Sequence, residues 1–165
     1  MDHILLDTNF VSVLFDPRRP NYNAVEARAQ AFGKTDLVYL SAIVLAELRY
    51  GMEAAQRLGQ DVSNIRRILT QAGSFPLAEV GRHTSEAYGD VKSRLADHYL
   101  DMSRRIPRWL EDWSDRASSK TLQVDENDLW IVAQAIERDY LLVTSDQRLA
   151  DRFCPAIPEL RISVV

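Results

Sequence analysis

Four acidic residues stand where carboxylates could act together on one ligand: Asp7, Glu47, Asp128 and Asp146. The first directly follows the apolar run Ile4–Leu6, and the last comes just after the apolar run Leu141–Thr144. If both runs are parallel strands, these two acids lie at the carboxyl edge of a sheet, which is where such sheets bind ligands. Asp is also a favoured helix N-cap, so either residue alone could simply begin a helix.

The position of Glu47 within a predicted helix argues that its carboxylate needs a partner. Each residue turns a helix by about 100°, which places Glu47 on the side of Ile43, Val44 and Tyr50, while Arg49 lies on a different side. We therefore expect Glu47 to face the interior. A buried, unpaired carboxylate is costly, so it should meet a cation, a metal or a proton.

Asp128 lies on an apolar face of another predicted helix. Ile131, Val132 and Ala135 follow it at helical spacing on the same side. Two interpretations are open. The carboxylate could point into a site, or Asp125 could be the N-cap and Asp128 the acid at the third helical position of a capping box.

Converging carboxylates would repel each other by about 4 kcal/mol per close pair, for a separation of about 4 Å and an effective dielectric constant near 20. A divalent cation would remove this repulsion. Oxygen ligands without His or Cys favour Mg²⁺ or Mn²⁺ over zinc or copper. Because Mg²⁺ in proteins commonly meets substrate phosphates, the four acids indicate phosphodiester chemistry.

Alternating strands and helices are predicted to position these acids. The expected helices cover residues 24–32, 42–58, 61–72, 83–98 and 127–136, with Ser41 as the N-cap of the second. The expected strands are Ile4–Leu6, Val38–Leu40, Phe75–Leu77, Leu141–Thr144 and Arg161–Val165. This order is typical of an α/β domain with a mainly parallel sheet between helical layers, and the length suits a single domain over residues 1–165.

Composition narrows the class of protein and of partner. A net charge of -4 argues against binding nucleic acid by general neutralisation of its phosphates, so any such contact should be local. The single cysteine, Cys154, excludes an internal disulfide framework and fits a reducing cytosol. The start of the sequence has no basic region followed by a long apolar run, so we expect a cytoplasmic protein without a membrane anchor.

Several segments resemble PIN-domain nucleases, especially the VapC-like toxins of type II toxin–antitoxin systems. The segments that carry the resemblance are residues 5–9 (LLDTN), 41–51 (SAIVLAELRYG), 127–133 (NDLWIVA) and 142–146 (LVTSD). Their order and spacing fit as well. No single segment would suffice, but the four together span most of the chain.

This resemblance implies a three-layer α/β/α fold with a sheet of about five strands, and a metal-dependent endoribonuclease. It assigns Asp7, Glu47, Asp128 and Asp146 as catalytic and metal-binding residues for Mg²⁺ or Mn²⁺, with Asn9 and Thr144 as supporting polar residues. It also implies RNA as substrate, products with a 5′-phosphate and a 3′-hydroxyl, a small cognate antitoxin and a homodimer.

One segment, about residues 99–120, is longer than the resemblance leads us to expect. Ile106, Trp109, Leu110 and Trp113 recur within it at helical spacing, which predicts an amphipathic helical insertion. It could clamp RNA, receive the antitoxin, extend a dimer interface or simply pack on the domain. The arginine pairs at positions 18–19 and 66–67 show no shared face and suggest solvated surface.

Two other classes of function stay open. A catalytically silent PIN-like module would bind RNA or protein without cleaving it, although the complete set of four acids argues against this. A phosphoryl-transfer domain, such as a phosphatase or receiver, is less consistent. It would need a second Asp where Asn9 stands and a lysine near Asp146. A dinucleotide-binding domain lacks its glycine-rich turn.

Overall fold

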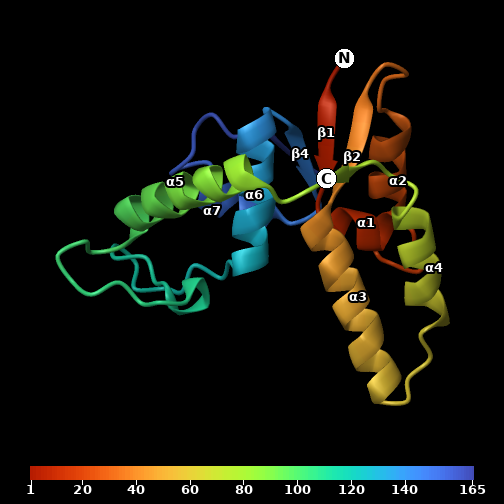
Figure 1. Cartoon of the computed structure of the whole chain (residues 1–165), viewed down its shortest axis with the longest axis horizontal. Coiled ribbons are helices and arrows are strands. Elements are labelled where there is room, and N and C mark those ends of the chain that lie inside the picture. Colours follow the sequence, from red (N-terminus) through yellow and green to blue (C-terminus); the bar gives the residue numbers. More distant parts are fainter.

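The structure, a computed structural model, describes residues 1–165 and contains a five-stranded parallel sheet between layers of helices (Figure 1). The strands are β1 (His3–Leu6), β2 (Leu37–Ser41), β3 (Leu77–Ala78), β4 (Leu141–Thr144) and β5 (Ile162–Val164). The α-helices are α1 (Thr8–Leu14), α2 (Tyr22–Gln30), α3 (Ala42–Arg57), α4 (Ser63–Ala72), α5 (Arg82–Tyr99), α6 (Glu126–Arg138) and α7 (Gln147–Phe153). The predicted three-layer α/β/α class is confirmed.

Strand β1 occupies the centre of the sheet, whose order is β3-β2-β1-β4-β5. Leu5 and Leu6 are completely buried, as expected of a strand covered on both faces. Leu6 is in register with Val143 of β4 and with Leu40 of β2. The carboxyl ends of the three central strands therefore lie side by side, and the residues that follow them meet at one edge.

A buried polar link sets the start of α3 against α6. Ser41 is the N-cap of α3, as predicted, and its Oγ accepts the Ile43 amide at 3.0 Å. The same hydroxyl donates to Gln134 Oε1 of α6 at 2.5 Å, and Gln134 in turn donates to the Ala78 carbonyl at 2.7 Å. In Figure 1, α3 extends downward beyond the carboxyl ends of the strands, and the N-terminal end of α6 lies to the left of α3.

The predicted amphipathic helix within residues 99–120 is wrong. The segment consists of turns and bends, one short 3-10 helix (Leu110–Asp112) and an isolated antiparallel bridge between Ser114 and Thr121. Pro107 explains the difference, because proline cannot donate a helical hydrogen bond and disfavours helical geometry in the residue before it.

Core packing holds this segment in place. Leu110 and Trp113 are 0% and 2% exposed, and the Trp113 indole donates to the Pro107 carbonyl at 2.9 Å. Trp109, at the same predicted spacing, is 55% exposed. The apolar pattern therefore predicted some of the residues that pack into the core, Leu110 and Trp113, but wrongly included Trp109 and wrongly predicted a helix.

No helix in the structure has both the length and the apolar character needed to cross a membrane.

Candidate functional site

A polar cavity of about 440 Å³ opens at the carboxyl edge of the sheet. Only one of its twelve lining residues, Val124, is hydrophobic. The cavity lining includes all four acids singled out in the sequence: Asp7, Glu47, Asp128 and Asp146. Asn9 lines it too, whereas Thr144 lies behind the cavity wall and acts through a hydrogen bond. Residues far apart in the chain thus meet in one place.

Asp7 is the most enclosed of the four acids, with 3% of its surface exposed. It occupies the N-cap position of α1, but its side chain makes no capping hydrogen bond. Thr144 Oγ1 instead donates to Asp7 Oδ2 at 2.7 Å and accepts the Asp146 amide at 2.9 Å. Burial raises the pKa of Asp7 above its ordinary value of 3.8, against the opposing effect of the Thr144 hydrogen bond. Helix capping does not explain this residue.

Asp128 has both of the roles considered for it. Asp125 Oδ1 accepts the Asp128 amide at 2.9 Å, and Asp128 Oδ2 accepts the Asp125 amide at 3.1 Å, which completes a capping box. Asp128 also lines the cavity. Burial, followed by the charge of Asp125 and smaller contributions from Asp7 and Glu47, raises the pKa of Asp128 from 3.8 to about 7.

Glu47 lies on α3 and already has hydrogen-bond partners. Thr8 donates to one of its carboxylate oxygens, and Asn127 Nδ2 donates to Oε1 at 3.0 Å. We expected Glu47 to face the interior, and in the structure it is half-buried in the cavity wall, while Tyr50, placed on the same side by the helical wheel, is 76% exposed. The Glu47 side of α3 forms a cavity wall, and only neighbours such as Val44 reach the core.

Asp146 forms an ion pair that the sequence analysis did not predict. Arg148 Nη2 lies 2.8 Å from Oδ2 and Nε lies 3.1 Å from Oδ1. Asp146 also caps α7 by accepting the Arg148 amide at 2.9 Å. The Arg148 hydrogen bonds hold the pKa of Asp146 below its ordinary value. An arginine two residues after an acid at a helix start was a local signal for this pair.

Other residues of the site escaped the sequence analysis altogether. Glu111, Thr121 and Gln123 line the cavity from the segment around residues 99–120 and from the residues just after it. Their neighbours Leu110 and Leu122 are buried and hold them in place. No sequence motif predicted that these residues line the cavity. In an irregular segment, tertiary packing and not a periodic pattern sets where each side chain points.

The arrangement suits a hard divalent cation in its chemistry but is not a finished binding site. No group of three His, Cys, Asp or Glu side chains stands ready to hold a metal ion. The available donors are nevertheless carboxylate oxygens, which Mg²⁺ prefers. Asp7 is buried, Asp128 is half-buried, and neither forms an ion pair, while each has its pKa raised in part by neighbouring negative charge. A cation placed between them would offset both effects.

Comparisons with known proteins agree with this fold. A model of the PIN domain matches residues 4–152. A chain from the VapBC2 complex of Rickettsia felis, bound to a DNA fragment from their promoter, is 20% identical with a TM-score of 0.66, over 99% of this chain and 98% of that chain. A chain from VapBC-1 of nontypeable Haemophilus influenzae is 22% identical with a TM-score of 0.65, over 98% and 97% of the two chains.

A third structure is a sarcin-ricin-loop-cleaving VapC toxin from Mycobacterium tuberculosis, which is 12% identical with a TM-score of 0.54, over 90% of this chain and 93% of that chain. At these identities the similarity establishes a shared fold. A search of curated proteins gave no match. Because the domain model covers nearly the whole sequence, and the acids it brings together lie at the expected edge of the sheet, the chain belongs to the PIN domain family.

Proposed function

We propose that this protein is a Mg²⁺- or Mn²⁺-dependent endoribonuclease and the toxin of a toxin–antitoxin pair. The observation that carries the proposal is the pair of Asp7, which is buried, and Asp128, which is half-buried, in a polar cavity shared with Glu47 and Asp146. Each acid of the pair has a raised pKa and forms no ion pair. A divalent ion would supply the missing positive charge.

Asp7 and Asp128 would hold the ion, and Glu47 and Asp146 would complete its surroundings. When bound, such an ion lowers the pKa of a coordinated water and stabilises the charge that builds on a scissile phosphate. Thr144 fixes the Asp7 carboxylate, while Thr8 and Asn127 fix that of Glu47. Hydrolysis would break the bond between phosphorus and O3′, leaving a 5′-phosphate and a 3′-hydroxyl.

The choice of RNA and of an antitoxin partner rests on family likeness. One similar structure is described as a sarcin-ricin-loop-cleaving toxin, and others are VapBC complexes. By analogy we assign this chain an RNA substrate, a small cognate antitoxin, a homodimeric state and a cytoplasmic location. The RNA substrate and the antitoxin follow the descriptions of these neighbours, whereas the homodimer and the location follow only from the resemblance to VapC-like toxins.

A catalytically silent PIN-like module that binds RNA or protein is the second candidate. The ion pair between Asp146 and Arg148 favours it, because one of the four acids is already engaged by an internal cation. The same cavity would then recognise a partner and not hydrolyse it. Metal binding by itself would not separate the two functions, whereas cleavage does.

The test is cleavage of a generic single-stranded RNA with Mn²⁺ or Mg²⁺, compared with the same reaction in EDTA. Asp7→Asn should lower the cleavage rate by at least about 100-fold, because it removes the most enclosed ligand. Asp97→Asn is the matched control, since Asp97 is exposed on α5. Equal residual activity in the wild type and Asp7→Asn would show a contaminating nuclease and an incorrect site. Metal binding without any cleavage would favour the silent module.

A further inference from the structure

A second cavity, of about 320 Å³, adjoins the acidic one. The two share Asn9, Asp146 and Arg148, so they form one continuous depression. The second cavity adds Ser12, Val13, Arg19 and Ser145. The first cavity is lined by six carboxylates and one cation, whereas the second is lined by two arginines and two serine hydroxyls beside a single acid.

The irregular segment contributes no positively charged residue to the lining of the acidic cavity. The residues that the irregular segment contributes there are Glu111, Thr121 and Gln123. Among the residues that line the two cavities, the only cations that a polyanion could meet are Arg148 and Arg19. Because the whole chain carries a net charge of -4, nucleic acid must be held by such a local group of arginines.

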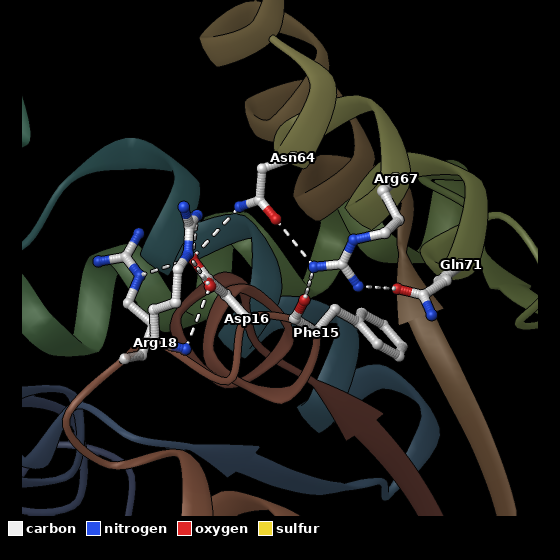
Figure 2. Close-up of polar contacts among 7 residues, drawn as sticks. Phe15, Asp16, Arg18, Asn64, Arg67 and Gln71 are labelled. Atoms are coloured by element: carbon white, nitrogen blue, oxygen red, sulfur yellow. Dashed lines mark hydrogen bonds and ion pairs between the residues drawn. The ribbon is translucent and has the colours of Figure 1, made fainter. Parts of the chain in front are cut away.

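The turn that carries Arg19 is fixed to the body of the protein (Figure 2). Asp16 in this turn is only 5% exposed, and its carboxylate accepts the Arg18 guanidinium at 2.8 and 3.1 Å and Asn64 Nδ2 of α4 at 3.2 Å. Arg67 donates to the Phe15 carbonyl at 2.6 Å and to Asn64 Oδ1 at 2.8 Å. The turn from α1 is thereby tied to α4.

The expectation that the arginine pairs lack a common surface is consequently wrong for Arg18 and Arg67, which belong to one network around Asp16 and Asn64 (Figure 2). Hydrogen bonds at short range commit both of these arginines to the protein. Although the Arg18 side chain is 74% exposed, its two hydrogen bonds to Asp16 and those of Arg67 hold the turn in place.

Arg19 differs from them. Its backbone amide donates to the Asp16 carbonyl at 3.0 Å, which places the residue within the fixed turn. Its guanidinium is 57% exposed and meets the Asp16 carboxylate only at 3.8 Å, while Arg18 satisfies that carboxylate at 2.8 Å. A contact this long between exposed groups contributes little, so the guanidinium can turn to another anion at small cost.

We propose that Arg19, with Ser12 and Ser145, binds a phosphate of single-stranded RNA next to the phosphate that is cleaved. This inference rests on the proposed nuclease function. It adds the path of the RNA strand, which would leave the acidic cavity across α1 and not across the irregular segment. Arginine suits the role because its guanidinium donates several hydrogen bonds to phosphate oxygens, and serine hydroxyls donate one each.

The experiment measures binding of a fluorescent single-stranded RNA in EDTA, where no cleavage occurs, over a series of salt concentrations. Arg19→Gln should weaken binding about fivefold at low salt, and the slope of log K against log salt should fall by about 0.7, the loss of one phosphate contact. Arg161→Gln is the matched control, because Arg161 pairs with Asp2 at the amino ends of the strands. It should change neither quantity.

A neutral methylphosphonate at one flanking linkage tests the contact directly. It should weaken binding to the wild type but cause no further loss in Arg19→Gln. Equal effects of Arg19→Gln and Arg161→Gln on the slope would overturn the proposal. So would a weakened affinity for an acidic peptide with RNA binding unchanged, which would assign the cavity to a protein partner.

The failure of this inference can be distinguished from failure of the nuclease function. If RNA is cleaved with Mn²⁺ but Arg19→Gln leaves both KM and the salt slope unchanged, the flanking contact is wrong and the nuclease stands. If nothing is cleaved while Arg19→Gln still lowers the slope, the RNA contact stands and the catalytic assignment is wrong.

Discussion

Asp7 and Asp128 differ from Glu47 and Asp146 in what surrounds their carboxylates. Asp7 is buried and Asp128 is half-buried, neither forms an ion pair, and burial raises the pKa of both. The second pair is already satisfied: Glu47 accepts hydrogen bonds from Thr8 and Asn127, and Asp146 pairs with Arg148. We conclude that a bound cation would be stabilised mainly by the carboxylates of Asp7 and Asp128, and that Glu47 and Asp146 contribute less because other groups already neutralise or bind them.

The largest effect expected from this comparison is on metal affinity. Asp7→Asn and Asp128→Asn should each weaken Mn²⁺ binding by more than the roughly 10- to 100-fold that loss of an outer partner causes. Asp146→Asn should weaken it less, because the lost charge is partly neutralised by Arg148 already. Calorimetric titration with Mn²⁺ measures all three. An equal loss in the three variants would remove the distinction between the pairs.

A smaller effect is expected at Thr144, which connects the two pairs. Thr144→Val keeps the shape of the side chain but leaves Asp7 Oδ2 and the Asp146 amide without their partner. We expect activity to fall about 10- to 100-fold, and the free energy of unfolding to fall by about 1–3 kcal/mol. Thr144→Ser retains the hydroxyl and should retain most of both. If the serine variant is as inactive as the valine variant, packing and not the hydrogen bond is responsible.

Sequence reasoning reached the sheet from its apolar runs, Glu47 and Asp128 from helical periodicity, and Asp7 and Asp146 from their positions just after strands together with the family resemblance. The apolar run Ile4–Leu6 is the buried central strand, and Ser41 is the N-cap of α3. The helical wheel also placed Asp128 on the side of its helix that is half-buried at the cavity. In each case the position depends on neighbours within one helical turn or one strand, and these can be read from the chain itself.

The ranking of the acids could not be obtained in the same way. The helical wheel favoured Glu47 and Asp128, whereas the structure gives Asp7 the deepest burial of the four. Burial of Asp7 depends on β4, and the partner Asn127 reaches Glu47 from a helix that lies 80 residues further along the chain. Such pairings are set by tertiary packing. Pro107 was visible in the sequence and should have excluded the helix expected around it.

A third effect concerns stability and pH, and it isolates Asp128. The pKa of this carboxyl is about 7 in the folded protein and near 3.8 in the unfolded chain. Between these values the unfolded chain binds fewer protons than the folded one, so the folded state loses stability as pH rises. Asp128→Asn removes this loss and keeps an oxygen that can accept the Asp125 amide in the capping box.

The variant should therefore gain about 1–3 kcal/mol of stability relative to the wild type between about pH 4 and pH 7, less than the full shift implies because part of the carboxyl meets solvent. Urea unfolding in EDTA at both ends of this range measures the difference. If the variant instead becomes less stable than the wild type as pH rises, the charged form of Asp128 acts mainly by stabilising the helix N-cap. Adding Mg²⁺ should raise the free energy of unfolding of the wild type more than that of the variant.

The smallest effect is expected at Arg148, which competes with a cation for Asp146. Arg148→Gln should strengthen Mn²⁺ binding about two- to fivefold at low salt, because an exposed ion pair contributes little and is easily screened. Arg161→Gln, which removes the same charge from the other edge of the sheet, should leave Mn²⁺ affinity unchanged. If Arg148→Gln weakens Mn²⁺ binding instead, the arginine orients the Asp146 carboxylate toward the ion. The second pair of acids would then be held in place by its partners and not merely neutralised by them.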